Sequence, residues 1–583
     1  MASFFAKLTR KKHMDEDHML TNLKRCLTTF DITLLGIGHM MGSGIYVLTP
    51  TVARQTAGPA IIISYLIAGF ASLLAALAYA EFGVKFPRAG SAYSYSYFSV
   101  GEFWAFFVGW NVLLENVIGI SAVARACSEY IDNLCGGVIR EWLRTSVGEM
   151  GGPLLSDHPD FLAFLIIVFY VAFMSVGVQA TSRLNNVLCI VNIVVLLIII
   201  VVGAYFAELK NWTDSATGGF TPFGMGGVLS ASATCFFAYV GFDAIAAAGE
   251  EAKDPQRSLP VATLCSMAIV TILYVAVSAV LTLMVNYSEI SPHSGLPAAL
   301  AAKGARWAEL LVTAGALAGM STVLIGTLYA LTRIAYAMAD DGLIHSVFSK
   351  VAAKSQIPLV SMYVFSLLAG VLAVVLDIET LVEMMSIGTL SAYLIVSGGV
   401  VIFRYRPNQI LKVTGHELKT IGGGGNGVSA AVSLNGAHLD TFDPAAQQLK
   451  PQAGWLQVVF PRNCRQQTVI AFCVATIAFS TFVIGFYAKY NWDRLGEPLS
   501  IVLVVVVSLT AVAAFLIILA HEQCQEPQRY KMPLVPLLPV ASIVVNAILM
   551  TTLQILTWGR LVIWLAIGLT GYFGYGLSHS KLN

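Results

Sequence analysis

The sequence predicts an all-α protein that crosses a membrane many times. Of its 583 residues, 57% are hydrophobic and only 11% are charged, and the mean hydropathy is +0.75. Soluble domains carry about 25% charged residues, so this chain has too few to cover the surface of a soluble globular fold. It also contains fourteen apolar stretches that approach the length of about 20 residues expected of a spanning helix.

The fourteen stretches form a group of ten and a group of four. A polar insert with the glycine run 422–425 separates the groups, and this composition is typical of a flexible linker. The predicted spans lie near residues 31–53, 59–83, 101–129, 160–179, 184–207, 227–249, 260–285, 308–338, 358–376, 379–403, 467–488, 498–520, 535–556 and 560–577. The predicted segments are a cytosolic N-terminal segment (1–30), a ten-helix core (31–403), a flexible cytosolic loop (404–466), four C-terminal helices (467–577) and a cytosolic C-terminus (578–583).

The placement of basic residues predicts that both termini are cytosolic. With that orientation, 24 of the 34 Lys and Arg residues fall in inside segments, as the positive-inside rule requires. The two N-x-S/T sequons, at Asn211 and Asn286, then lie in outside loops, and we predict glycosylation there.

The sequence excludes several function classes. The net charge of +1 gives no sign of nucleic-acid binding, and the charged N-terminus does not resemble a cleaved signal peptide. The nine cysteines form no C-x-x-C pair or zinc spacing, although Cys127 and Cys135 are candidates for one disulfide. No Walker lysine, H-E-x-x-H or G-x-S-x-G motif is present. We therefore expect no metal, no cofactor and no enzymatic reaction.

The first span contains the glycine-rich stretch GIGHMMGSGIYV, residues 36–47. One interpretation is close helix packing, because Gly38 and Gly42 have the G-x-x-x-G spacing that lets membrane helices approach. The other is a helix interruption, since glycine weakens a helix by roughly 1 kcal/mol relative to alanine. His39 lies inside the stretch, and the sequence leaves open whether it titrates or is simply packed.

A helix interruption inside a membrane exposes backbone groups that can bind both the carboxylate and the ammonium group of an amino acid. Its exposed amides attract a carboxylate, and its exposed carbonyls attract an ammonium group. Five helices later, ATCFFAYVGFDAIAAAGEE (233–251) repeats the signal with an aromatic cluster, Gly241 and the intramembrane carboxylate Asp243. Two interruption signals at corresponding positions predict the substrate site of a transporter built on an inverted repeat.

Several motifs resemble the cationic amino acid transporters of the amino acid–polyamine–organocation superfamily. They include GIGHMMGSGIYVLTPTVA, YAEFGVKFPRAGSAYSYSYFSVGEFWAFFVGWN and RIAYAMADDGLIHSVFSKV, and the likeness covers residues 25 to 577. The segment GHMMGSGIYVLT is most similar to sequences of the branch called cationic amino acid transporter 4. The resemblance implies a LeuT-type fold, in which helices 1–5 and 6–10 are inverted repeats, with four additional helices.

The resemblance also implies a binding site for the amino acid backbone. In the turn Gly42-Ser43-Gly44, the amides of Ser43 and Gly44 would hold the substrate carboxylate, and the carbonyl of Met40 would face its amine. Carbonyls of the sixth span would complete the amine site, and an aromatic side chain would close over the substrate. The carbonyls belong to Phe237, Ala238 and Val240, and the aromatic gate is Phe237 or Tyr239.

Polar residues inside other spans are candidates for the side-chain end of the substrate. Glu115 and Asn111 lie one helical turn apart and would complement a cationic side chain, or else pair within the bundle. Asp243 would sense a proton or the substrate charge, with a structural hydrogen bond as the alternative. Arg125 near an outer helix end is expected to snorkel or to form an ion pair.

Two further residues bear on gating and coupling. Glu81 resembles a family position near the cytosolic gate. Several bacterial relatives have a lysine on the fifth helix that replaces a coupling sodium ion, whereas LNNVLCIVNIVVLL places Asn192 there. Asparagine has no charge to exchange with a proton, so sodium-independent facilitated transport or exchange is the simpler mechanism.

The sequence therefore predicts a sodium-independent carrier of cationic L-amino acids such as arginine, lysine and ornithine, working by alternating access. The alternatives are a carrier of neutral amino acids or polyamines, and an amino-acid sensor with little transport. The expected partners are an amino acid substrate and the lipid bilayer, with no nucleic acid; the sequence leaves an accessory subunit open. We expect the plasma membrane, with an endolysosomal membrane as the alternative.

Overall fold

A computed structural model gives the fold of the chain. It describes residues 7–582 except 9, 13–22, 24, 43, 149–155, 157, 214–217, 292–294, 353–354, 407–448, 451–464, 492–493, 495 and 525–528. The predicted cytosolic loop 404–466 and the N-terminal segment 1–30 therefore lie largely outside the described residues, and so does Ser43.

Helices occupy all fourteen predicted spans, which confirms the prediction of an all-α multi-pass protein. Ten helical stretches of the described chain are long and apolar enough to cross a membrane, and one of them, Thr29–Lys85, covers the first two predicted spans. Three shorter apolar helices, Phe161–Met174, Leu359–Val375 and Leu537–Thr552, fill the remaining positions. Among the described residues, the only β-structure is two isolated bridges.

The spans are ordered along the chain as the sequence predicts. The principal helices of the first ten are α2 (Thr29–Met40), α4 (Ile61–Lys85), α6 (Glu102–Leu134), α8 (Phe161–Met174), α9 (Val178–Tyr205), α11 (Gly224–Phe236), α13 (Pro255–Met284), α15 (Arg306–Asp340), α16 (Leu359–Val375) and α17 (Ile378–Arg404). The last four are α18 (Gln466–Tyr490), α19 (Pro498–Ala520), α20 (Leu537–Thr552) and α21 (Ile555–Gly571).

Two spans are interrupted, as predicted. In the first, α2 begins at a capping box formed by Thr28 and Asp31, ends at Met40, and is followed by a π-helical turn at Gly44–Leu48. In the sixth, α11 passes through a 3₁₀ turn, leaves the helix at 240–242 and resumes as α12 (Asp243–Ala247).

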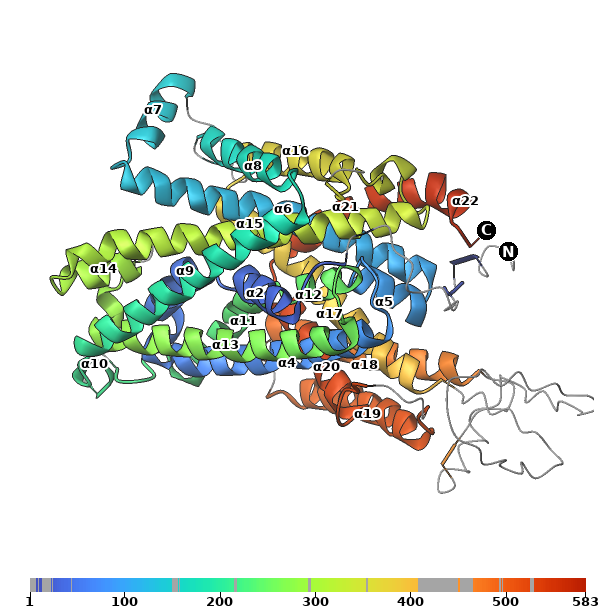
Figure 1. Ribbon diagram of the computed structural model, residues 1–583. Helices are drawn as coiled ribbons and strands as arrows, with labels where there is room; N and C mark the ends of the chain where they lie inside the picture. Colours follow the sequence, from blue (N-terminus) through green and yellow to red (C-terminus); the bar gives the residue numbers. More distant parts are fainter. Residues whose placement is uncertain are drawn as a thin grey trace, which may run out of the picture.

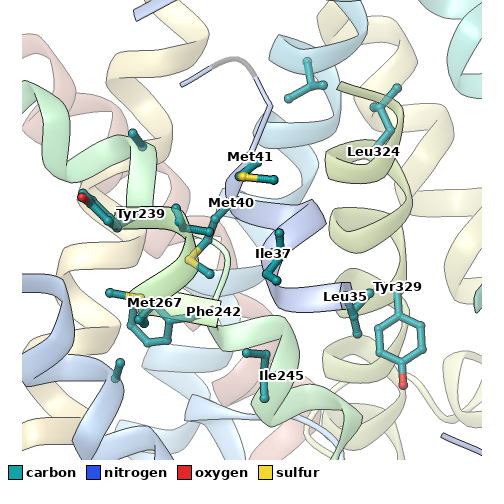
Figure 2. Packing of buried hydrophobic residues seen from close by; sticks show 14 of the residues in the cluster. Leu35, Ile37, Met40, Met41, Tyr239, Phe242, Ile245, Met267, Leu324 and Tyr329 are labelled. Carbon is teal, nitrogen blue, oxygen red and sulfur yellow. The ribbon is translucent and has the colours of Figure 1, made fainter. Parts of the chain in front are cut away.

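The interrupted helices lie at the centre of the bundle. Helix α2 packs against α12 on one side and against α15 on another. Figure 2 shows this arrangement, with Phe242 and Ile245 of the sixth span on one flank of α2 and Leu324 and Tyr329 of α15 on the other. Both chain termini lie at one end of the bundle, and α7 (Val138–Val147), α10 (Lys210–Thr213) and α14 (Gly295–Ala302) lie at the other (Figure 1).

The structure differs from the predictions made from the sequence in three respects. The last two helices meet at 553–554, rather than near Thr557. In the described chain, four short α-helices that the sequence did not predict lie between spans: α5 (Ala92–Ser99), α7, α10 and α14. Cys127 and Cys135 are free thiols. Their eight-residue separation along α6 corresponds to about 12 Å, whereas disulfide-bonded Cα atoms are about 4–7 Å apart.

A buried carboxylate ties the two ends of the chain to the core. Glu102, at the start of α6, accepts hydrogen bonds from Tyr97 (2.8 Å), Tyr572 (3.0 Å) and Ser580 (2.7 Å). It also forms a 3.0 Å ion pair with Arg10. Because Glu102 is fully buried, these partners take the place of water around its carboxylate.

We predict that Glu102→Ala destabilises the protein, because it leaves the Arg10 guanidinium without its partner in a buried site. Breaking a buried ion pair costs about 3 kcal/mol or more. The measurement is thermal unfolding of purified protein in detergent, with the exposed Glu289→Ala as control. Equal melting temperatures for the two variants would contradict a structural role for this carboxylate.

Candidate functional site

A cavity of about 1030 Å³ runs from the two helix interruptions to the end of the bundle that carries α7. Its inner part is lined by His39, Met40 and Gly44 of the first span, and by Phe237, Ala238 and Val240 of the sixth. Its outer part is lined by Ile139, Arg140 and Leu143 of α7. The cavity therefore joins the predicted backbone-binding segments to one side of the molecule.

The opposite side is closed by contacts between the same two spans. Leu27, just before α2, forms a bridge with Ala252, and its amide donates to the carbonyl of Glu251 at 3.0 Å. The Glu251 carboxylate pairs with Arg333 of α15 at 2.7 Å, and both side chains are buried. The Arg333 guanidinium also lies over the ring of Tyr329.

Side chains of neighbouring helices satisfy the backbone at the first interruption. The Asn192 amide on α9 donates to the Met41 carbonyl at 3.0 Å, and its oxygen accepts from the Tyr46 hydroxyl at 2.6 Å. Thr322 of α15 donates to the Gly38 carbonyl at 2.8 Å. Asn192, which the sequence placed at the coupling position, therefore forms hydrogen bonds to residues on both sides of the interruption in the first span.

One tyrosine connects the two interruptions. The hydroxyl of Tyr274 on α13 lies 2.8 Å from the Met40 carbonyl and 3.1 Å from the Ala238 carbonyl. Its ring stacks on Tyr65 with centroids 4.8 Å apart and meets Tyr239 edge to face at 5.5 Å. The single hydroxyl hydrogen of Tyr274 can bond to either of the two carbonyls expected to face the substrate amine, or be shared between them.

The glycines of the first interruption are required by close contacts. A Cβ atom at Gly44 would lie 2.6 Å from the Tyr274 hydroxyl oxygen and 2.8 Å from the Ala238 Cβ. At Gly42, it would overlap the side chain of Val323. A larger residue at either position would force the first span away from its neighbours. No position is described for Ser43.

The two candidate gate residues of the sixth span differ in position. Phe237 lines the cavity. Tyr239 is fully buried behind it, where its hydroxyl donates to the Tyr65 carbonyl at 2.9 Å. In this conformation, Phe237 is the aromatic residue in contact with the cavity.

The three predicted side-chain residues are buried in one region, but only Glu115 lines the cavity. Asp243 interacts electrostatically with Glu115, and both interact with Tyr79 and Tyr393. Asn111 is fully buried one turn from Glu115, and neither of its side-chain polar atoms has a hydrogen-bond partner among the described residues. Asn111 and Asp243 therefore lie behind the cavity wall that Glu115 forms.

The cavity lining carries more negative than positive charge. Carboxylates outnumber guanidinium groups by five to two among the lining residues: Glu115, Glu129, Asp132, Asp160 and Asp377 against Arg125 and Arg140. A narrow cleft in a low-dielectric wall focuses such a charge excess, which raises the local concentration of cations.

The cavity arginines have structural partners. Arg125 donates to the carbonyls of Ala373 (3.0 Å) and Leu376 (2.6 Å) at the end of α16, and to Ser156. Arg140 pairs with Glu129 at 3.5 Å and with Asp132 at 3.6 Å. Arg125 therefore caps the end of a helix, and the carboxylates of Asp160, Asp377 and Glu129 also interact with it electrostatically.

The remaining predicted residues lie away from the cavity. Glu81 is buried, pairs with Arg404 at 2.6 Å and accepts from the Met532 amide at 2.8 Å, so it joins α4 to α17 and to the chain before α20. Asn211 donates to the Leu283 carbonyl at 2.7 Å, and Asn286 accepts from the Ser288 amide at 3.1 Å.

Sequence reasoning missed the Tyr274 bridge and the Arg333–Glu251 pair. An ionisable residue within a predicted span, such as Arg333, was an available signal. Tyr274 carried no such signal, because a single tyrosine in an apolar run resembles ordinary packing.

Sequence comparison with known proteins finds transporters, as the helix interruptions and the cavity suggest. The amino acid permease family matches residues 27–434, and the C-terminal region of amino acid permeases matches 530–580. Mouse cationic amino acid transporter 4 is 42% identical, over 100% of this chain and 92% of its own length. The vacuolar cationic amino acid transporter 4 of Arabidopsis thaliana is 32% identical, over 99% and 96%.

A Bacillus subtilis methylthioribose transporter is 40% identical over 67% of this chain and 83% of its own length. Membership of the family implies a LeuT-like fold and a transport function rather than an enzymatic one. The chain is a multi-pass integral membrane protein that belongs to the amino acid permease family, within its cationic amino acid transporters.

Proposed function

We propose that this protein is a sodium-independent transporter of cationic L-amino acids such as arginine, lysine and ornithine. The observation that carries the proposal is the cavity: it ends at two interrupted helices and is lined by more carboxylates than guanidinium groups. The free amides and carbonyls at the interruptions can bind the carboxylate and the ammonium group of an amino acid, and the acidic side chains favour a positively charged substrate side chain.

The asymmetry of the cavity supports alternating access. One side is open toward α7, while the other is closed by the Leu27–Ala252 bridge and the buried Arg333–Glu251 pair. Both closing contacts involve the interrupted spans or the residues next to them. Movement of these spans relative to α15 would break the Arg333–Glu251 pair on one side and close the cavity on the other.

The backbone of the substrate would lie across the two interruptions. We propose that the amides of Ser43 and Gly44 hold its carboxylate, and that carbonyls of Met40, Phe237, Ala238 and Val240 face its amine. A carbonyl oxygen has two lone pairs, and the Tyr274 hydroxyl has a single hydrogen to donate to Met40 or Ala238, so both oxygens can still accept a bond from the substrate.

Sodium independence rests on Asn192. Its amide makes one hydrogen bond to Met41 and accepts one from Tyr46. A neutral side chain in this position satisfies the interrupted backbone without a bound cation. We place the protein in the plasma membrane with cytosolic termini. An endolysosomal membrane is the alternative, because one of the similar proteins is a vacuolar transporter.

The relatives do not decide the substrate alone, because a methylthioribose transporter is nearly as similar as the amino acid transporters. Radiolabelled uptake into proteoliposomes separates the candidates. We expect saturable uptake of arginine and lysine with and without sodium, and little uptake of leucine or putrescine. Binding of arginine without uptake would favour a sensor, and leucine uptake without arginine uptake would overturn the cationic preference.

We predict that Gly44→Leu abolishes uptake while surface expression persists, because the new side chain would collide with Tyr274 and Ala238 at the interruption. The matched control is Gly559→Leu, since Gly559 on α21 has open space around it. Substrate uptake by Gly44→Leu at the wild-type rate would show that this glycine serves packing only.

We predict that Glu115→Gln raises the KM for arginine about tenfold, because hydrogen bonds to charged groups contribute about 1.5–3 kcal/mol. The control is Glu141→Gln on α7, an exposed carboxylate outside the cavity lining. The KM is measured from initial uptake rates. A fall in maximal rate alone, with the KM unchanged, would argue that Glu115 stabilises the bundle instead.

A further inference from the structure

His39 is a polar residue at the floor of the cavity that the proposed backbone-binding set does not use. It lies in the last turn of α2, directly before Met40, and it lines the cavity together with Thr327 of α15. Nε2 lies 3.0 Å from the Thr327 hydroxyl oxygen. Nδ1 is buried and has no hydrogen-bond partner among the described residues.

Two glycines create the space for this ring. A Cβ atom at Gly241, in the sixth-span interruption, would lie 3.0 Å from the imidazole Cγ. A Cβ atom at Gly326 of α15 would lie 2.8 Å from the same atom. The backbone of Gly241 also has positive φ (+130°), which favours glycine there. The imidazole of the first span is thus wedged between the sixth span and α15, which fixes its position.

The hydrogen bonds of Thr327 determine which ring nitrogen carries the proton. A threonine hydroxyl has one hydrogen, and the Thr327 hydroxyl donates it to the Val323 carbonyl at 2.8 Å. With the hydrogen placed there, the Thr327 oxygen accepts from the ring, and Nε2 bears the hydrogen of a neutral imidazole. Nδ1 is then an acceptor with no donor.

We propose that Nδ1 of His39 accepts a hydrogen bond from the α-ammonium group of the substrate, and that Thr327 acts as a positioning residue by fixing the tautomer. This inference rests on the proposed function and adds a side-chain contact to the amine site. An ammonium group has three N–H donors. The partly occupied carbonyls of Met40 and Ala238 lie on the same cavity floor, so the imidazole supplies an acceptor that is otherwise unused.

The test compares ligands that differ only in the amine. Full-length protein in proteoliposomes takes up radiolabelled L-arginine, and unlabelled L-arginine and 5-guanidinopentanoic acid, which lacks the α-amine, compete. His39→Ala is expected to raise the inhibition constant of arginine about tenfold and to leave that of 5-guanidinopentanoic acid unchanged. His39→Asn, whose side-chain oxygen can replace Nδ1, is expected to restore part of the affinity.

Thr327→Val is expected to weaken arginine binding in the same direction, because the ring loses the acceptor that fixes its tautomer. Thr313→Val is the matched control: Thr313 lies on the same helix and donates to the carbonyl four residues earlier, as Thr327 does, but it does not contact His39. If leucine proves to be the transported amino acid, leucine and 4-methylpentanoic acid replace the arginine pair.

The outcomes separate this inference from the proposed function. Unchanged arginine affinity in His39→Ala, or an equal loss of affinity for both ligands, would overturn the role of Nδ1 while leaving the transporter intact. A lack of saturable uptake of any amino acid by the wild-type protein would overturn the proposed function and this inference together. If His39→Ala fails to fold, the comparison of Thr327→Val with Thr313→Val decides the question.

Discussion

The need to satisfy backbone polar groups that two interrupted helices release inside a membrane governs the rest of this structure. Lipid offers no hydrogen-bond partners, so each such carbonyl or amide must be paired by protein or face a cavity. The neighbouring helices supply that pairing here. Asn192 bonds the Met41 carbonyl, Thr322 bonds the Gly38 carbonyl, and the Tyr274 hydroxyl lies within hydrogen-bond distance of carbonyls from both interruptions.

The Tyr274 bridge also links binding to movement. A hydroxyl that contacts Met40 and Ala238 at once holds the first and sixth spans at a fixed separation. The stacked ring of Tyr65 and the edge of Tyr239 fix the orientation of Tyr274. The two interrupted spans are therefore expected to move as one unit. The contacts that must change during a transport cycle are then those between this unit and α15, such as the Arg333–Glu251 pair.

The sequence was sufficient for the general architecture and for the interruptions. Hydropathy located all fourteen helices, because each span must be apolar over its whole length, and glycine in an apolar run pointed to the broken helices. It could not separate Phe237, which lines the cavity, from the nearby Tyr239, which does not. That difference depends on the twist of the 3₁₀ turn that carries both residues. Nor could it identify Tyr274 or Thr327, because their roles arise from contacts with distant segments.

The distribution of partners among the cavity carboxylates bears on charge selectivity. Glu129 and Asp132 are paired with Arg140. Asp160 caps α8 by accepting from the Ala163 amide at 2.9 Å and also accepts from Ser128. These outer carboxylates attract cations into the cavity, but each already has a hydrogen-bond or ion-pair partner within the protein. Glu115 interacts with a second carboxylate, Asp243, rather than with an arginine. A cation beside Glu115 would stabilise the ionised form of this carboxyl group. Recognition of a positive side chain would therefore depend on Glu115 of α6, deep in the cavity, rather than on the outer carboxylates.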